Sequence, residues 1–239
     1  MMAPSSNSGA PTVLLVAHGT RDPRGVAAIG DLADAAASRT GAPVRVAFVD
    51  VLGPTPDEVL ADAPGPVLVV PVFLASGFHV HTDVRGAAER SGRADVVVAP
   101  ALGPDPALAR LLADRVAEAG PCDAVILAAA GSSDLRAIAD IETAATQLAE
   151  HTGAAVSTAY VATGTPRVPD AVQRARAAGA DRVVVATYLL APGLFHSRLA
   201  DAGADVVTAP LLSAGGTARV ADLVAERHAA HLDSARSTR

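Results

Sequence analysis

The sequence contains no lysine, no tryptophan and only one cysteine, Cys122. A single cysteine excludes a disulfide within the chain and fits a reducing compartment. The basic residues are all arginine, and the acidic residues outnumber them to give a net charge of −6. A general nucleic-acid-binding protein carries a basic face that meets phosphate. We find no basic stripe, so we expect no nucleic-acid partner.

Long apolar runs and a leader sequence are also missing. No apolar run approaches the ~20 residues that cross a bilayer, and residues 1–10 lack the charged and apolar regions of a signal peptide. We therefore expect a cytoplasmic protein with no membrane partner. Aromatic residues make up only 3% of the 239 residues, so the core must consist of Val, Leu, Ile and Ala.

Short β-branched runs alternate with helical patterns along the whole chain. The runs predict strands at residues 12–17, 43–49, 67–72, 94–99, 123–130 and 154–161, and a further apolar run lies within residues 182–193. Between them, helices are expected at about 22–38, 54–60, 80–90, 105–118, 133–151 and 167–178. This alternation is typical of βαβ units, and it predicts an α/β fold with parallel sheets.

The second half of the sequence repeats the first. The segment PVLVVPVFLASG at 66–77 parallels RVVVATYLLAPG at 182–193, and ADVVVAP at 94–100 parallels ADVVTAP at 204–210. Matches in the same order indicate an internal duplication. We predict two similar doubly wound halves at 12–120 and 121–230, with disordered tails at 1–11 and 231–239.

Three ligating side chains follow the first three predicted strands. The common winding of such a sheet places strand one between strands two and three, so their carboxyl ends are neighbours. His18, Asp50 and His79 would then meet at one edge, as an open site for a divalent metal such as Fe, Co, Ni or Zn. On the segment 71–83 alone, the alternative that His79 and His81 cap a helix or face solvent stays open.

The second half keeps the scaffold and loses these histidines. Ala130 stands at the position of His18, and Phe195 at that of His79. His196 either reaches the crevice between the halves or is a polar residue at a helix start. We expect the second half to form a wall of a pocket in that crevice. The turn at 18–23 lacks the glycine fingerprint of a dinucleotide site, and there is no Walker loop, so nucleotide binding is unsupported.

Three motifs resemble those of one known family. Residues 17–23 read AHGTRDP, residues 48–50 read FVD, and residues 71–79 read PVFLASGFH with Asp83 following. In these the chain resembles the sirohydrochlorin chelatases, the class II chelatase family. The resemblance implies a chelatase-type fold that holds a tetrapyrrole between its halves. It also implies that His18 and His79 bind metal and act in catalysis. Asp50 stands where the family has Glu.

The implied activity is insertion of a divalent metal into sirohydrochlorin without ATP, in siroheme or cobalamin biosynthesis. We favour Fe²⁺, which gives siroheme, with Co²⁺ as the near alternative. The metal is a substrate, and we expect no tightly bound cofactor. A non-catalytic tetrapyrrole or metal carrier on the same scaffold is the alternative from another class, and a nucleotide-binding α/β protein is a more distant one.

The resemblance also suggests substrate contacts. Arginines pair well with the many carboxylates of this substrate. We expect Asp50 to complete the metal site or to orient one imidazole. The expected substrate-binding residues are Thr20, Arg21, Phe78, His81, Arg85, Phe195, His196 and Arg198, with Arg24 as a further arginine near the pocket. The oligomeric state is left open.

Overall fold

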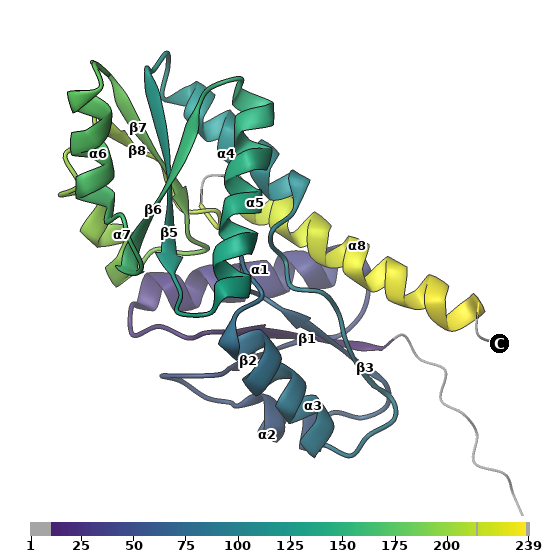
Figure 1. Ribbon diagram of the computed structural model, residues 1–239. Coiled ribbons are helices and arrows are strands. Elements are labelled where there is room, and N and C mark those ends of the chain that lie inside the picture. Colours follow the sequence, from purple (N-terminus) through teal and green to yellow (C-terminus); the bar gives the residue numbers. More distant parts are fainter. Residues whose placement is uncertain (1–10, 214, 238–239) are drawn as a thin grey trace, which may run out of the picture.

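A computed structural model describes residues 11–213 and 215–237 and shows two four-stranded parallel sheets (Figure 1). The first sheet has the order β2-β1-β3-β4, and the second has the order β6-β5-β7-β8. The strands of the first sheet are β1 (Thr12–Ala17), β2 (Val44–Phe48), β3 (Val67–Pro71) and β4 (Val96–Val98). Those of the second are β5 (Ala124–Gly131), β6 (Val156–Thr163), β7 (Val183–Tyr188) and β8 (Val206–Val207). The predicted duplicated α/β fold is confirmed, with the first strand of each half between its second and third.

The helices begin and end at residues suited to these positions. Asp22 and Asp134 cap α1 and α5, each accepting from the backbone N–H two residues ahead, and Gly41 and Gly153 end the same helices with φ of 63° and 67°. The helices are α1 (Pro23–Thr40), α2 (Pro56–Asp62), the π-helix η1 (His79–Val84), α3 (Arg85–Arg90), α4 (Pro106–Glu118), α5 (Leu135–Thr152), α6 (Val168–Ala177), α7 (Leu194–Leu199) and α8 (Gly216–Ser237).

The predicted C-terminal tail needs correction. Residues 231–237 continue α8 as regular helix, so the expectation of disorder from residue 231 was wrong for this segment. Residues 1–10 of the predicted N-terminal tail lie outside the described residues, and Pro11 leads directly into β1. Within the described ranges, no helix combines the length and the hydropathy needed to cross a bilayer.

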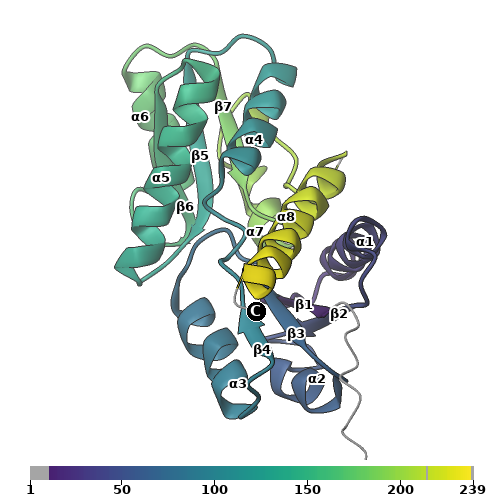
Figure 2. The ribbon, with the colours of Figure 1, turned by 90° about the vertical axis from the view of Figure 1, so that its right-hand side faces the viewer.

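The last helix of each half packs on the sheet of the other half. Helix α4 lies against α5 and β7 of the second sheet, while α8 lies against α1 and β3 of the first (Figures 1 and 2). On the opposite faces, α2 and α3 cover the first sheet and α6 covers the second. The segments 12–120 and 121–230 therefore exchange their terminal helices, which the sequence repeat alone does not reveal.

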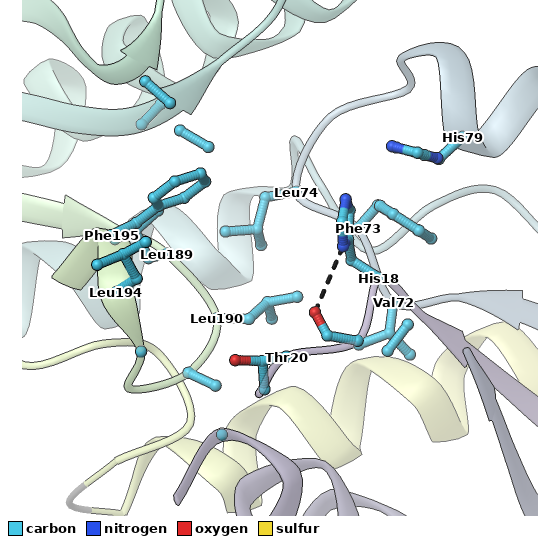
Figure 3. Close-up of a pocket in the computed structure, with 18 of the residues that line it drawn as sticks. His18, Thr20, Val72, Phe73, Leu74, His79, Leu189, Leu190, Leu194 and Phe195 are labelled. Carbon is cyan, nitrogen blue, oxygen red and sulfur yellow. Dashed lines mark hydrogen bonds between the residues drawn. The ribbon is translucent and has the colours of Figure 1, made fainter. Parts of the chain in front are cut away.

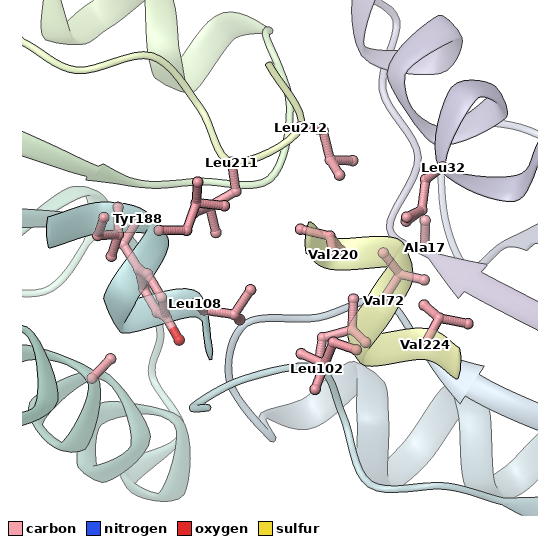
Figure 4. Close-up of a cluster of buried hydrophobic side chains, with 14 of the residues drawn as sticks. Ala17, Leu32, Val72, Leu102, Leu108, Tyr188, Leu211, Leu212, Val220 and Val224 are labelled. Atoms are coloured by element: carbon pink, nitrogen blue, oxygen red, sulfur yellow. The ribbon is translucent and has the colours of Figure 1, made fainter. Parts of the chain in front are cut away.

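One aliphatic cluster runs through both halves. It combines side chains from β1, β3, β5 and β7 with side chains from α1, α4, α5 and α8, and includes Leu32, Leu108 and Val220 (Figure 4). The buried guanidinium of Arg115 on α4 adds a polar tie, because it donates to four carbonyl oxygens of the loop after β8, those of Ala209, Pro210, Leu211 and Ser213. The shared core holds the two halves together along one side and leaves the cleft at the strand ends open.

Candidate metal centre and binding cleft

A cleft of about 1410 Å³ lies between the two halves. It is lined by the segments that follow β1, β3, β5 and β7, that is, by residues from 17–25, 72–80, 129–133 and 188–197 (Figure 3). Each half thus supplies the loop after its first strand and the loop after its third. This is the carboxyl edge of the sheets, where open α/β folds bind ligands, as the sequence predicted.

His18 and His79 meet at one wall of this cleft. His18 is the first residue after β1, and His79 is the first residue of η1, which follows β3. Since β1 and β3 are paired in the sheet, their carboxyl ends are neighbours. The two imidazole rings lie edge to face, with centroids 4.7 Å apart and planes at 78°. The structure therefore brings the predicted histidine pair together.

Each histidine uses Nδ1 in a local contact. Nδ1 of His79 lies 2.6 Å from Oδ2 of Asp83, and Nδ1 of His18 lies 3.3 Å from the carbonyl oxygen of Gly19. A carbonyl oxygen only accepts, and so does an ionised carboxylate, so in the neutral form of each ring these contacts assign the proton to Nδ1. Within the described part of the chain, no hydrogen bond engages Nε2 of either ring. Both Nε2 lone pairs are therefore available to a metal.

The His79 ring is also held by two aromatic side chains. It stacks on Phe73, with centroids 6.2 Å apart and planes at 18°, and it meets Phe78 edge to face at 5.7 Å. Phe78 is 58% exposed, so it reaches into the cleft while it contacts His79. The ring is thus confined on its faces and edges as well as at Nδ1.

Gly19 fixes the loop that carries His18. Its φ is 99°, and a Cβ on it would overlap the carbonyl oxygen of Asp50. The backbone N–H of Asp50 donates to the carbonyl oxygen of His18 at 2.9 Å, so the loops after β1 and β2 are tied together. The same geometry recurs in the second half, where Gly131 has φ of 88° and packs as closely on Thr163. The duplication has therefore kept the loop and replaced the histidine.

Asp50 does not join the histidine pair. Its Oδ1 accepts from the backbone N–H of Val51 at 2.8 Å, and the residue is not among those that line the cleft. In residues 11–213 and 215–237, no group of three or more His, Cys, Asp or Glu side chains is placed to hold a metal ion. The expected three-residue convergence is thus corrected to two histidines. The carboxylate that contacts an imidazole is that of Asp83 and not that of Asp50, which accepts from the N–H of the next residue in its own loop.

The expected substrate contacts divide into two groups. Those that line the cleft are Thr20, Arg21, Phe78, Phe195 and His196, whereas His81, Arg85, Arg198 and Arg24 do not. Arg24 is held by the carboxylate of Asp22 at 2.8 Å. Arg198 lies over the Phe195 ring at 5.9 Å from its centroid. Arg21 is the one arginine among the described residues that line the cleft.

Two histidines near the cleft interact across the halves. Burial lowers the pKa of His196 in α7, the charge of Arg24 from the first half lowers it further, and a hydrogen bond with the Thr208 backbone opposes both effects. His81 in η1 acts on Asp134 of the second half: the Arg136 hydrogen bond lowers the pKa of Asp134 most, and His81 adds a smaller lowering. His196 does reach the crevice, because it lines the cleft, whereas His81 is not among the residues that line it.

Two hydrogen bonds behind the cleft were not anticipated from the sequence. The hydroxyl of Tyr188 donates to the carbonyl oxygen of Leu74 at 2.8 Å, and the backbone N–H of Ser76 donates to Asp140 at 2.7 Å. Both link the loop after β3 to the second half. Tyr188 stands in the repeat at the position of Val72. This change from an aliphatic residue to one with a hydroxyl was the sequence signal that could have indicated the first of these hydrogen bonds.

Comparisons with known proteins agree with this architecture. The CbiX family model matches residues 12–119 and again 124–231. The chain therefore belongs to the CbiX family, and the resemblance to the sirohydrochlorin chelatases is confirmed. A sirohydrochlorin cobaltochelatase of Methanothermobacter thermautotrophicus is 31% identical over 130 residues, which cover 45% of this chain and 91% of the relative.

Solved structures show the same fold over nearly the whole chain. SirB from Bacillus subtilis with Fe³⁺ superposes with a TM-score of 0.75 at 18% identity, covering 95% of this chain and 98% of SirB. A CbiX described as the terminal enzyme of siroheme biosynthesis in denitrifying bacteria gives a TM-score of 0.64 at 21% identity, covering 89% and 97%. The chelatase-like fold predicted from the sequence is thereby confirmed.

Proposed function

We propose that the protein is a sirohydrochlorin chelatase that inserts Fe²⁺ or Co²⁺ into its tetrapyrrole substrate. One observation carries the proposal: two histidine rings lie edge to face at the wall of a large cleft between two chelatase-like halves. Membership of the CbiX family and the printed activity of the cobaltochelatase relative support the substrate.

The chemistry suits a pair of neutral imidazoles. Metal insertion exchanges two pyrrole N–H protons for one divalent cation, so the site must hold a metal weakly and accept protons. An imidazole with a pKa near ~6.5 does both close to neutral pH. In our proposal, Nε2 of His18 and Nε2 of His79 present the metal and then take up the released protons. Two protein ligands leave the other coordination positions free for transfer to the macrocycle.

The cleft walls fit a flat, apolar ring with charged edges. Phe78, Leu194 and Phe195 are exposed hydrophobic residues that line the cleft. Figure 3 shows Leu194 and Phe195 among the residues of its wall. Such surfaces mark binding sites, and here they offer faces on which a macrocycle can lie. Arg21 supplies a guanidinium for a substrate carboxylate. The volume exceeds the ~300–1,000 Å³ of a drug-sized pocket and leaves room for a tetrapyrrole.

The metal is proposed as a substrate, with no tightly bound cofactor and no nucleotide, and the site of action as the cytoplasm. Imidazole nitrogens suit both iron and cobalt. We favour Fe²⁺, which gives siroheme, and keep Co²⁺ as the alternative product metal.

The test is an anaerobic visible-absorbance assay. Purified protein and sirohydrochlorin are mixed with Fe²⁺ or Co²⁺, each against a blank of metal and substrate without protein. A rate above the blank is expected, and the ratio of the two rates ranks the metals. A spectral shift on tetrapyrrole binding without acceleration by either metal would instead favour the carrier, and failure to bind the tetrapyrrole would overturn both functions.

A further inference from the structure

We propose that Asp83 is a positioning residue that fixes His79 in the tautomer whose Nε2 binds the metal. The inference rests on the proposed role of His79 as a metal ligand. Asp83 is not among the residues that line the cleft; it acts through the hydrogen bond between its Oδ2 and Nδ1 of His79, which measures 2.6 Å.

The π-helix η1 places the two side chains together. Val80 and Val84 are buried and anchor one face of the turn, at 4% and 1% exposure. His79 and Asp83 precede them by one residue each, so they lie side by side on the adjoining face, with side chains 37% and 36% exposed. Single turns of π-helix inside longer helices are frequent at functional sites. In η1, the same turn carries the buried residues Val80 and Val84 and, beside them, the proposed metal ligand His79 with Asp83.

The contacts of the His79 ring control two separate properties, the position of the ring and the nitrogen that carries the proton. Phe73 and Phe78 restrict where the ring lies, but an aromatic contact does not select which nitrogen carries the proton. Only the hydrogen bond at Nδ1 does so. A carboxylate acceptor holds the proton on Nδ1, keeps the Nε2 lone pair free and makes the ring a stronger donor to a metal.

His18 has no such partner. Its Nδ1 meets a neutral carbonyl at 3.3 Å, whereas His79 meets a charged carboxylate at 2.6 Å. Because of Asp83, the two histidines differ in how firmly Nδ1 is held, and His79 has the more fixed orientation. Without Asp83, the His79 ring would still be held between Phe73 and Phe78, but either of its nitrogens could carry the proton.

The first experiment reads the tautomer in metal-free protein. Long-range ¹H–¹⁵N correlation spectra at about pH 8 should show His79 protonated on Nδ1 in the wild type. In Asp83→Ala, we expect a mixture or a change to Nε2 protonation, and Asp83→Asn should retain the wild-type tautomer in part because its amide oxygen still accepts. Nε2 protonation of His79 in the wild type, or Nδ1 protonation in Asp83→Ala, would overturn the proposal.

The second experiment measures Co²⁺ binding without tetrapyrrole, from the visible absorption of the bound ion. Removal of an outer partner of a metal-binding histidine costs about 10–100-fold in affinity, and we expect this loss in Asp83→Ala. Thr82→Ala, an exposed change in the same turn, should bind as the wild type does. Unchanged affinity in Asp83→Ala would overturn the role of Asp83, whereas unchanged affinity in His79→Ala would overturn the proposed metal site itself.

Discussion

The imidazole rings of His18 and His79 lie edge to face 4.7 Å apart, although each follows a different strand of the first sheet. In the proposed function, replacing either histidine by alanine removes one metal ligand and one proton acceptor. We expect kcat/KM for metal insertion to fall about 10²–10⁴-fold in each variant, the usual contribution of a positioned acid or base. The measurement is the anaerobic absorbance assay with saturating metal.

Tetrapyrrole binding should survive the same changes, because the apolar walls of the cleft are intact. His151→Ala serves as the matched control, since His151 is an exposed histidine at the end of α5, away from the cleft. Wild-type turnover in His18→Ala or His79→Ala would refute the assignment, and a loss of turnover in His151→Ala would point to a general effect of losing a histidine.

Arg21 is expected to recognise a substrate carboxylate. It lines the cleft, whereas Arg85 is an exposed arginine outside it. A hydrogen bond to a charged group contributes about 1.5–3 kcal/mol, so Arg21→Gln should raise KM for sirohydrochlorin by about 10–100-fold with a smaller effect on kcat. Arg85→Gln should change KM little. Equal effects of the two substitutions, measured over a range of tetrapyrrole concentrations, would contradict the structural distinction.

Much of this fold could be predicted because its signals are local. The strands are short apolar runs, and the repeat of 66–77 at 182–193 copies both pattern and order. Parallel pairing then forces residues that follow neighbouring strands to one edge, so the sequence alone predicts that His18 and His79 lie together. A glycine at the carboxyl end of each first strand also recurs, at Gly19 and Gly131.

Side-chain direction and long-range packing could not be predicted in the same way. Asp50 follows its strand as expected, but the torsions of its loop turn the carboxylate onto the N–H of Val51. Asp83 stands four residues after His79, and that spacing pairs the two side chains only once the segment is known to be helical. The exchange of α4 and α8 could not be predicted, because an amphipathic pattern shows which face of a helix is buried but not which sheet buries it.

The Tyr188 hydroxyl should stabilise the junction between the halves. Burial raises the pKa of Tyr188, so the phenol stays neutral and donates to the carbonyl oxygen of Leu74. Tyr188→Phe leaves that buried carbonyl without its partner and should lower the free energy of unfolding by about 1–3 kcal/mol in urea titrations. Tyr160→Phe is the control, because Tyr160 is also buried and its hydroxyl has no hydrogen bond in the described part of the chain. Equal stabilities of the two variants would contradict this role.

His228 should make the stability depend on pH. It is 5% exposed in α8, and its Nε2 has no hydrogen-bond partner among the described residues. Burial lowers its pKa, and the charge of His231 adds to this, so the unfolded chain binds a proton there more readily than the folded protein does. The contribution of neutral His228 to the free energy of unfolding is therefore complete above the unfolded pKa of ~6.5, and it declines as pH falls towards the lower folded pKa.

His228→Leu cannot take up that proton, so its urea midpoint should fall less than that of the wild type between about pH 7.5 and 5.5. The exposed His151→Leu should follow the wild-type slope, and a wild-type slope in His228→Leu would show that another group causes the loss.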